Sequence, residues 1–264
     1  MDSTSHTLQG ALRPQRMVIN DRPALVVAGA TGVLGAEVLS RLAGSGRFSN
    51  VGVMACEPIT TRLSGVSIVL APDAPFEDWP VRSGVQVGVV MFEPPRLYYD
   101  RERALWTPVP DQLPALANWL RSCGVQTLVV VMPHVQGRLP DALKLGLATL
   151  DEHAVTAAGF ERVLFVRSAQ KSQGTKPSGL FRRTAAWMLS TLSYMVPVTE
   201  QVVRPSKIAE FIEATLRVLP AGTHMAPPEL LWQAAQSGRK SLSGESIHSV
   251  VQAWLNGSLD ASRP

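Results

Sequence analysis

Three glycines at three-residue spacing are the part of the chain best suited to chemistry. They lie in "GATGVLG", directly after the apolar run "ALVVA" and directly before an amphipathic run. In such a loop the first glycine permits a tight turn, the second lets the backbone approach a pyrophosphate, and the third lets helix and strand pack closely. Amides at the start of the helix would face the phosphates. The motif predicts a dinucleotide site, the alternative being an ordinary turn without a ligand, and its residues are Gly29, Ala30, Thr31, Gly32, Val33, Leu34 and Gly35.

The adenosine end of such a site is usually set at the end of the second strand. An acidic residue about 20 positions after the glycines binds the ribose hydroxyls, whereas basic residues accept the extra phosphate of NADP. Glu57 lies 22 residues after Gly35 and could be that acid, and Arg62 lies further along. We therefore expect NAD or NADP as the cofactor, with Glu57 favouring NAD. The alternative for Glu57 is a solvated loop carboxylate.

Apolar runs of strand length alternate with helix-length segments along most of the chain. The runs are continuously apolar, which is typical of strands buried on both faces, and the alternation predicts right-handed crossovers in a parallel sheet. The predicted fold class is α/β, a doubly wound parallel sheet of Rossmann type with ligands at the carboxyl ends of its strands. The expected strands are 24–28, 51–55, 67–70, 85–92, 127–132 and 162–166, and the expected helices are 33–42, 111–122, 140–158, 179–194, 205–219 and 245–255.

The length of 264 residues suits one large domain better than two. Residues 1–22 are polar and are expected to form a loose arm, residues 23–257 the dinucleotide-binding domain, and residues 258–264 a loose tail. Within the domain, the part after about Ser168 is expected to form a smaller substrate-side lobe. The amphipathic segment 245–255 could pack on the sheet or on a partner, so a homodimer is one option.

Composition excludes several classes of function. The net charge is only +4 and no basic run is interleaved with aromatic residues, which argues against nucleic-acid binding. No apolar stretch approaches the roughly 18 residues that span a bilayer, and the first 22 residues lack the apolar core of a secretory signal. The two cysteines, Cys56 and Cys123, have no metal-ligand spacing, so we expect no metal site and a reducing, cytoplasmic location.

The stretch "GATGVLGAEVLSRLAGSGRFSNVGVM" resembles the start of atypical short-chain dehydrogenases of the NmrA-like and Tat-interacting-protein-like groups. Later segments resemble the same family, namely "LANWLRSCGVQTLVVVMP", "LATLDEHAVTAAGFERVLFVRSA" and "VVRPSKIAEFIEATLRVL". The resemblance implies an NAD(P)-binding, oxidoreductase-like Rossmann protein. It also implies that residues at the ends of the fourth, fifth and sixth strands line the cofactor, which are Phe92, Pro133 and Ser168 here, with Lys171 close to the substrate.

The residues that such dehydrogenases use for hydride transfer are missing at the expected places. The family uses a serine, a tyrosine and a lysine four positions later, which lowers the pKa of the tyrosine. By the resemblance, the helix after the fifth strand holds Lys144 and Ala148 where the tyrosine and lysine would stand. The usual chemistry is therefore doubtful. The three tyrosines are Tyr98, Tyr99 and Tyr194, and four positions after them stand Glu102, Arg103 and Val198.

A histidine stands where the family serine is expected. The fifth strand is followed by Pro133 and His134, at the edge where ligands bind. Because a histidine can exchange a proton near neutral pH, His134 is the candidate acid or base. The alternative is that His134 caps the strand loop. Lys144 on the next helix is a substrate-side candidate, with a solvated lysine as its alternative.

The segment 93–110 after the fourth strand is long and rich in proline, arginine and aromatic residues. Arg96 and Tyr98 in this segment could hold an anionic substrate near the nicotinamide side. The segment is either a lid over the ligand crevice or a surface excursion. Since the charges of residues 100–103 alternate in sign, a charged helical turn is the simpler interpretation of its middle.

Three functions remain open on the sequence. The first is an NAD(P)-dependent reductase or epimerase that acts on a small organic substrate with non-standard catalytic residues. The second is a non-catalytic dinucleotide-binding protein with a regulatory or redox-sensing role, favoured by the missing tyrosine and lysine. The third is a fold retained for protein contacts with an empty or blocked loop. Fold analogy alone assigns no substrate.

Overall fold

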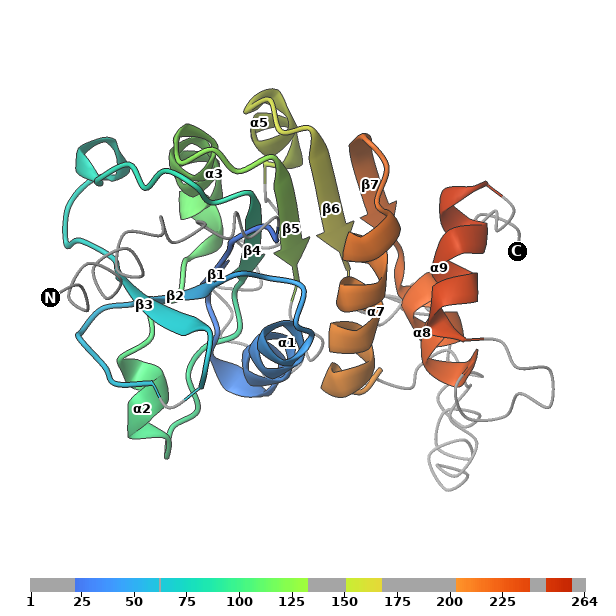
Figure 1. Cartoon of the computed structure of the whole chain (residues 1–264), viewed down its shortest axis with the longest axis horizontal. Coiled ribbons are helices and arrows are strands. Elements are labelled where there is room, and N and C mark those ends of the chain that lie inside the picture. The colour runs from blue at the N-terminus through green and yellow to red at the C-terminus, as the bar shows by residue number, and fades with distance from the viewer. Residues whose placement is uncertain (1–21, 62, 133–150, 168–202, 238–245, 258–264) are drawn as a thin grey trace, which may run out of the picture.

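Seven parallel strands form one sheet in the order β3-β2-β1-β4-β5-β6-β7 (Figure 1). The computed structural model describes residues 22–61, 63–132, 151–167, 203–237 and 246–257. The order confirms the predicted doubly wound parallel sheet of Rossmann type. The strands are β1 (Leu25–Ala28), β2 (Val51–Ala55), β3 (Val66–Leu70), β4 (Val87–Met91), β5 (Thr127–Val131), β6 (Arg162–Val166) and β7 (Gly222–Ala226).

Helices cover both faces of this sheet. On one face, α1, α7, α8 and α9 pack in one apolar core, with α1 and α7 side by side, and on the other face α3 and α5 pack in a second. A short helix, α2, lies beyond the carboxyl ends of the strands. Their bounds are α1 (Gly32–Gly44), α2 (Asp100–Arg103), α3 (Leu113–Ser122), α5 (Glu152–Ala157), α7 (Pro205–Val218), α8 (Pro228–Ser237) and α9 (Ile247–Leu255), with 3-10 turns at Phe76–Asp78 and Pro110–Gln112.

The two cores follow from the two-residue period of a strand. In β1, Leu25 and Val27 face the core with α1, whereas Val26 and Ala28 face the core with α3. All four are buried, as continuous apolar runs predict for a sheet covered on both sides. This packing fixes β1, and with it the loop that follows, between two layers of helices.

The structure departs from the predicted elements mainly near the C-terminal end. β7 and α8 were not predicted. β7 has the sequence "GTHMA" and lies at the edge of the sheet, where four of its five residues are at least partly exposed. No continuous apolar run therefore marks it. The predicted helix 140–158 is described only in part, as α5, and the predicted helix 179–194 lies outside the described residues. The arm, tail and lobe boundaries stay predictions.

The strand order has its switch point between β1 and β4, which is where sheets of this type bind ligands. The chain passes from β1 to β2 on one side, and it later returns to β4 on the other side of β1. At such a switch point the two connections diverge, and this leaves room outside the carboxyl ends of the strands. The glycine loop at residues 29–35 lies at this point, because it joins β1 to α1.

Membrane spans and metal clusters do not occur in the part of the chain that the structure describes. No helix there is both long and apolar enough to cross a bilayer. No group of three or more His, Cys, Asp or Glu side chains there could hold a metal ion. Cys56 is exposed and Cys123 is buried, and both are free thiols.

Candidate functional site: the glycine loop and the segment over it

The first and third glycines are required by close backbone packing. Gly29 has a φ of 74°, and a Cβ there would lie 2.0 Å from the carbonyl oxygen of Met91 in β4. A Cβ on Gly35 would lie 2.6 Å from the carbonyl carbon of Ala30. Neither distance is compatible with a side chain, so the loop turns tightly against β4 and α1 starts close to the sheet. Both roles agree with the motif.

The space beside the second glycine is filled by a side chain of the same protein. Gly32 has a φ of 70°, and a Cβ there would lie 2.3 Å from the carboxyl carbon of Glu93. The amide of Leu34 donates a hydrogen bond of 2.7 Å to Oε2 of Glu93. A carboxylate therefore stands where the motif predicts an approaching pyrophosphate.

A second carboxylate also contacts the loop. The amide of Gly32 donates to Oε2 of Glu102 at 3.1 Å, and Glu102 is only 7% exposed. Arg96 holds the same carboxylate through its backbone amide at 2.9 Å and its Nε at 2.8 Å. The free amides at the start of a helix attract anions. The start of α1 thus binds oxyanions in this structure, and both are supplied by the protein itself.

Both carboxylates belong to one segment, residues 93–107, which we call the strap. The strap leaves the end of β4, crosses the glycine loop and reaches the end of β2. Two backbone hydrogen bonds hold the strap at the end of β2. The amide of Trp106 donates to the carbonyl of Met54 at 3.0 Å, and the amide of Cys56 donates to the carbonyl of Ala104 at 2.8 Å. Gly29 donates to the carbonyl of Trp106 at 3.0 Å. In Figure 1, α2 marks the strap at the lower left, at the end to which the strand arrowheads point.

The loop holds the strap by a side chain as well. The hydroxyl of Thr31, which is fully buried, donates to the backbone carbonyl of Glu93 and lies 2.9 Å from the hydroxyl of Thr107. Thr31 therefore contacts both ends of the strap. A residue predicted to bind cofactor is engaged by the protein's own chain.

The two carboxylates have opposite pKa shifts. Burial raises the pKa of Glu93, the nearby charge of Glu102 adds to this, and hydrogen bonds from Leu34 and Val33 only partly offset it. Burial acts in the same direction on Glu102, but the hydrogen bonds from Arg96 and Gly32 outweigh it and lower the pKa of that carboxyl. The site thus stabilises the ionised form of Glu102, whereas burial disfavours the ionised form of Glu93.

The remaining predicted site residues lie at different depths. Val33 is 43% exposed at the start of α1, Glu57 is exposed beyond the end of β2, and Tyr98 is 94% exposed on the strap. Phe92 is buried in the core with α3. Arg96, expected on the substrate side, pairs with Glu102 and stacks over the ring of Tyr99 at 3.8 Å. The predicted residues outside the described part of the chain are Arg62, Pro133, His134, Lys144, Ser168 and Lys171.

The charged helical turn expected in the middle of the segment 93–110 is present, whereas a lid over a ligand stays a prediction. Residues 100–103 form the charged helical turn α2, and the segment that contains them covers the glycine loop. Glu93 and Glu102 were not among the predicted site residues. A signal was present for Glu93, because it directly follows the fourth apolar run and so had to stand at the ligand edge of the sheet.

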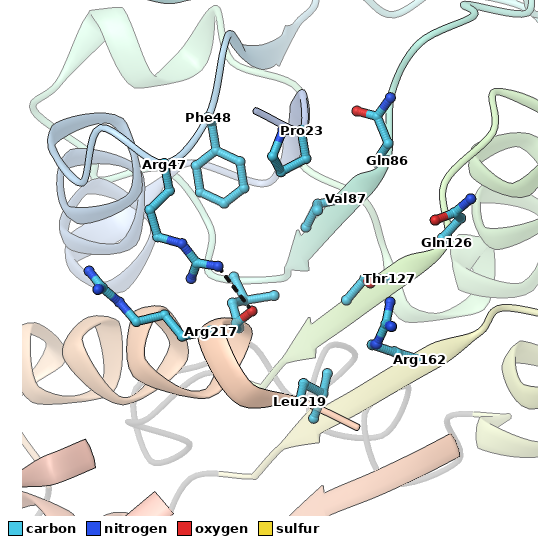
Figure 2. A pocket seen from close by; sticks show the side chains of 11 residues that line it. Pro23, Arg47, Phe48, Gln86, Val87, Gln126, Thr127, Arg162, Arg217 and Leu219 are labelled. Atoms are coloured by element: carbon cyan, nitrogen blue, oxygen red, sulfur yellow. Dashed lines mark hydrogen bonds between the residues drawn. The ribbon is translucent and has the colours of Figure 1, made fainter. Parts of the chain in front are cut away.

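A separate cavity of about 330 Å³ opens at the opposite, amino-terminal edge of the sheet (Figure 2). Arg47 reaches across it and donates to the carbonyls of Glu213 at 3.4 Å and Leu216 at 3.3 Å, near the end of α7. Two more arginines line it, and each has an acidic partner: Arg162 pairs with Glu161 and Arg217 with Glu213. Each of the three arginines therefore already contacts a carbonyl or a carboxylate of the chain, so this cavity is not the candidate site.

Comparisons with known proteins give no family by sequence. No protein-family model matches the chain, and no curated protein matches it. Solved structures with a similar arrangement include a nucleoside-diphosphate-sugar epimerase from Staphylococcus aureus, at 15% identity and a TM-score of 0.44, covering 90% of this chain and 91% of that one.

Two further solved structures are similar at the same level. The triphenylmethane reductase of Citrobacter sp., solved with NADP(H), has 17% identity and a TM-score of 0.43 over 76% of this chain and 68% of that one. An NADPH-dependent quinone oxidoreductase from Escherichia coli has 13% identity and a TM-score of 0.44 over 90% of this chain and 91% of that one. The fold class is defined by the strand order of the chain itself.

Proposed function

We propose that this chain binds a nicotinamide dinucleotide, with the pyrophosphate on the amides of Gly32 and Leu34. One observation carries the proposal: both amides already donate to carboxylate oxygens. A carboxylate and a phosphate are both oxyanions that accept hydrogen bonds from a helix N-terminus, so donors that hold one fit the other. The loop therefore retains the geometry of an anion cradle.

The elements around the loop suggest how the cofactor would lie. Its adenosine would point toward the end of β2, where Glu57 could accept hydrogen bonds from the ribose, which favours NAD over NADP. Its nicotinamide would point toward the ends of β4 and β5. The bound group would supply hydride transfer at that end.

A regulatory or redox-sensing role fits this chain best. The sequence has no tyrosine followed four residues later by lysine, which is the pair that exchanges the proton in short-chain dehydrogenases. A reductase or epimerase on a small organic substrate is the second candidate. It is favoured by β5, which ends at Val131 in the middle of the sheet, three residues before His134. The free thiols of Cys56 and Cys123 support a cytoplasmic location.

Calorimetric titration with NAD⁺, NADH, NADP⁺ and NADPH tests the proposal. We expect at least one of them to bind. Val33→Asp adds a negative charge beside the cradle at an exposed position in the first turn of α1, where it should not harm the helix. It should weaken binding about tenfold or more, because the charge repels a pyrophosphate. Leu63→Asp is the matched control, since Leu63 is 54% exposed in the turn between β2 and β3.

Two results would count against the proposal. If none of the four dinucleotides binds at millimolar concentration, the loop is not a cofactor site. If Val33→Asp and Leu63→Asp bind as the unmodified protein does, the nucleotide lies elsewhere. Once binding is found, incubation of the NADH or NADPH complex with carbonyls and quinones separates the two roles. Oxidation of the cofactor would favour the enzyme.

A further inference from the structure

We propose that the strap is a built-in competitor of the dinucleotide, so that residues 96–103 must lift from the glycine loop before a pyrophosphate can bind. This inference rests on the proposed function of the loop. It assigns to Glu102 and Glu93 the role of setting how tightly the chain holds its cofactor. The strap then couples cofactor binding to a change of the protein surface, which is what a sensor requires.

The competition follows first from the shared donors. The amide of Gly32 donates to Glu102 and the amide of Leu34 donates to Glu93. Each backbone amide carries a single hydrogen, so it serves the carboxylate or the phosphate but not both at full strength. A pyrophosphate seated on these amides must displace both side chains.

Steric exclusion and charge repulsion also oppose the binding of a pyrophosphate while the strap is closed. A Cβ on Gly32 would lie only 2.3 Å from the carboxyl carbon of Glu93, so the space beside the loop is already filled. Glu93 and Glu102 would also bring two negative charges beside a pyrophosphate, and among the described residues Arg96 is the cation that acts on both carboxyls. Like charges at such distances repel strongly where water is scarce.

The strap is built to release its middle and keep its end. Its far end is anchored by Trp106, whose ring lies 5.5 Å from that of Trp79 and 6.1 Å from that of Phe76. Its middle presents Leu97 and Tyr98 to solvent, at 76% and 94% exposure. Residues 96–103 reach the loop through the carboxylate of Glu102, and Glu93 at the near end needs only to rotate its side chain.

A closed strap lowers the apparent affinity by the fraction of molecules that are open. A hydrogen bond between a charged group and a buried donor is strong enough to shift such an equilibrium by about tenfold to a hundredfold. Removing the carboxylate of Glu102 should therefore open the strap and tighten cofactor binding by about tenfold or more. Most substitutions at a binding loop would do the opposite.

Calorimetric titration of Glu102→Ala with NADH and NADPH tests this expectation. Asp100→Ala is the matched control, because it removes the same charge from the same helical turn at a side chain that is 93% exposed and does not contact the loop. Glu102→Gln keeps the size of the side chain and loses its charge, so it serves if the alanine variant folds poorly. We expect the Glu102 variants to bind about tenfold tighter, and Asp100→Ala to bind as the unmodified protein does.

Hydrogen exchange separates lifting of the strap from a simple charge effect. The amide of Leu105, in the anchored end, donates at 3.1 Å to the backbone carbonyl of Glu102, in the part that lifts. In the unmodified protein saturated with cofactor this hydrogen bond should break, so the amide of Leu105 should exchange faster. The amides of Cys56 and Trp106 should not change, because they belong to the anchored end and report on general loosening.

The titrations and the exchange experiment together either support or overturn the proposed competition. Tighter binding by the Glu102 variants together with faster exchange of the Leu105 amide supports the inference. Equal or weaker binding by those variants overturns it and leaves the cofactor site intact, as does unchanged exchange in the saturated protein. If neither the unmodified protein nor the Glu102 variants bind a dinucleotide, the proposed function fails and the competition fails with it.

Discussion

Two glutamates are buried in the part of the chain that the structure describes, and they are held in different ways. Glu213 in α7 is 3% exposed and accepts hydrogen bonds from Arg41 of α1, at 3.0 Å, and from Arg217 of its own helix, at 2.9 Å. Glu102 in the strap is 7% exposed and is held by Arg96 and by the amide of Gly32. In both cases the hydrogen bonds and charges outweigh burial and lower the pKa of the carboxyl.

The difference lies in what the partners could do without the glutamate. Arg41 and Arg217 lie on helices that are packed together, and both pair with the single carboxylate of Glu213. The amide of Gly32 belongs to a helix N-terminus, which offers the same donors to any anion that reaches it. Glu213 is therefore a permanent tie between helices, whereas Glu102 occupies a place that a ligand could take. Burial alone does not distinguish the two roles.

The largest effect is expected at the helix tie. Glu213→Ala leaves two arginines without their carboxylate and should lower the free energy of unfolding by about 2 kcal/mol, which is less than for a fully buried ion pair because both arginines are half exposed and can be hydrated. Urea unfolding at neutral pH measures this loss. Calorimetry should give unchanged dinucleotide affinity. A loss of under about 1 kcal/mol would show that Glu213 is no tie.

A smaller loss is expected at the strap. Glu102→Ala should lower the free energy of unfolding by about 1 kcal/mol, because Arg96 and the freed amide of Gly32 can be hydrated once the strap loosens. The same urea titrations measure it. Glu102 would be as permanent a tie as Glu213 if Glu102→Ala destabilised the protein as much as Glu213→Ala does. In that case the strap would be a fixed part of the fold.

The glycine loop and most of the sheet could be predicted from the sequence because their signals are local. "GATGVLG" encodes the turn within seven residues, and buried strands such as β4 are continuous apolar runs. β7 escaped prediction because an edge strand is covered on fewer sides, and "GTHMA" has no such run. Its place beside β6 comes from the sheet and not from its own sequence.

The strap contacts could not be predicted, because they join positions far apart in the sequence. Leu34 and Glu93 are 59 residues apart, and Gly32 and Glu102 are 70 apart. They meet only because β4 lies beside β1, which the strand order decides. The alternating charges of residues 100–103 also resemble an ordinary solvated turn. Which of those charges turns inward depends on the path of the backbone after β4.

The smallest effect is expected at Glu93, and its sign should be opposite to that at Glu102. Because the fold raises the pKa of Glu93, the folded protein favours the protonated form, and the stability that Glu93 contributes is present at low pH and is lost as the pH rises through its folded pKa. Glu93→Gln removes the ionised form and keeps an oxygen that can accept from Leu34. It should raise the free energy of unfolding at neutral pH by less than about 1 kcal/mol.

Urea unfolding of both glutamate-to-glutamine variants across pH checks these signs. The gain from Glu93→Gln should shrink as the pH falls through the raised folded pKa of Glu93 and should be gone below about pH 4, where the unmodified side chain is protonated in the folded and the unfolded protein. Glu102→Gln should destabilise the protein at neutral pH, and that loss should fade as the pH drops through the lowered pKa of Glu102. If both substitutions changed the free energy of unfolding in the same direction, the loop would hold the two carboxylates in the same way. Opposite signs would show that the cradle holds one anion firmly and tolerates the other, so that an incoming pyrophosphate displaces Glu93 more easily than Glu102.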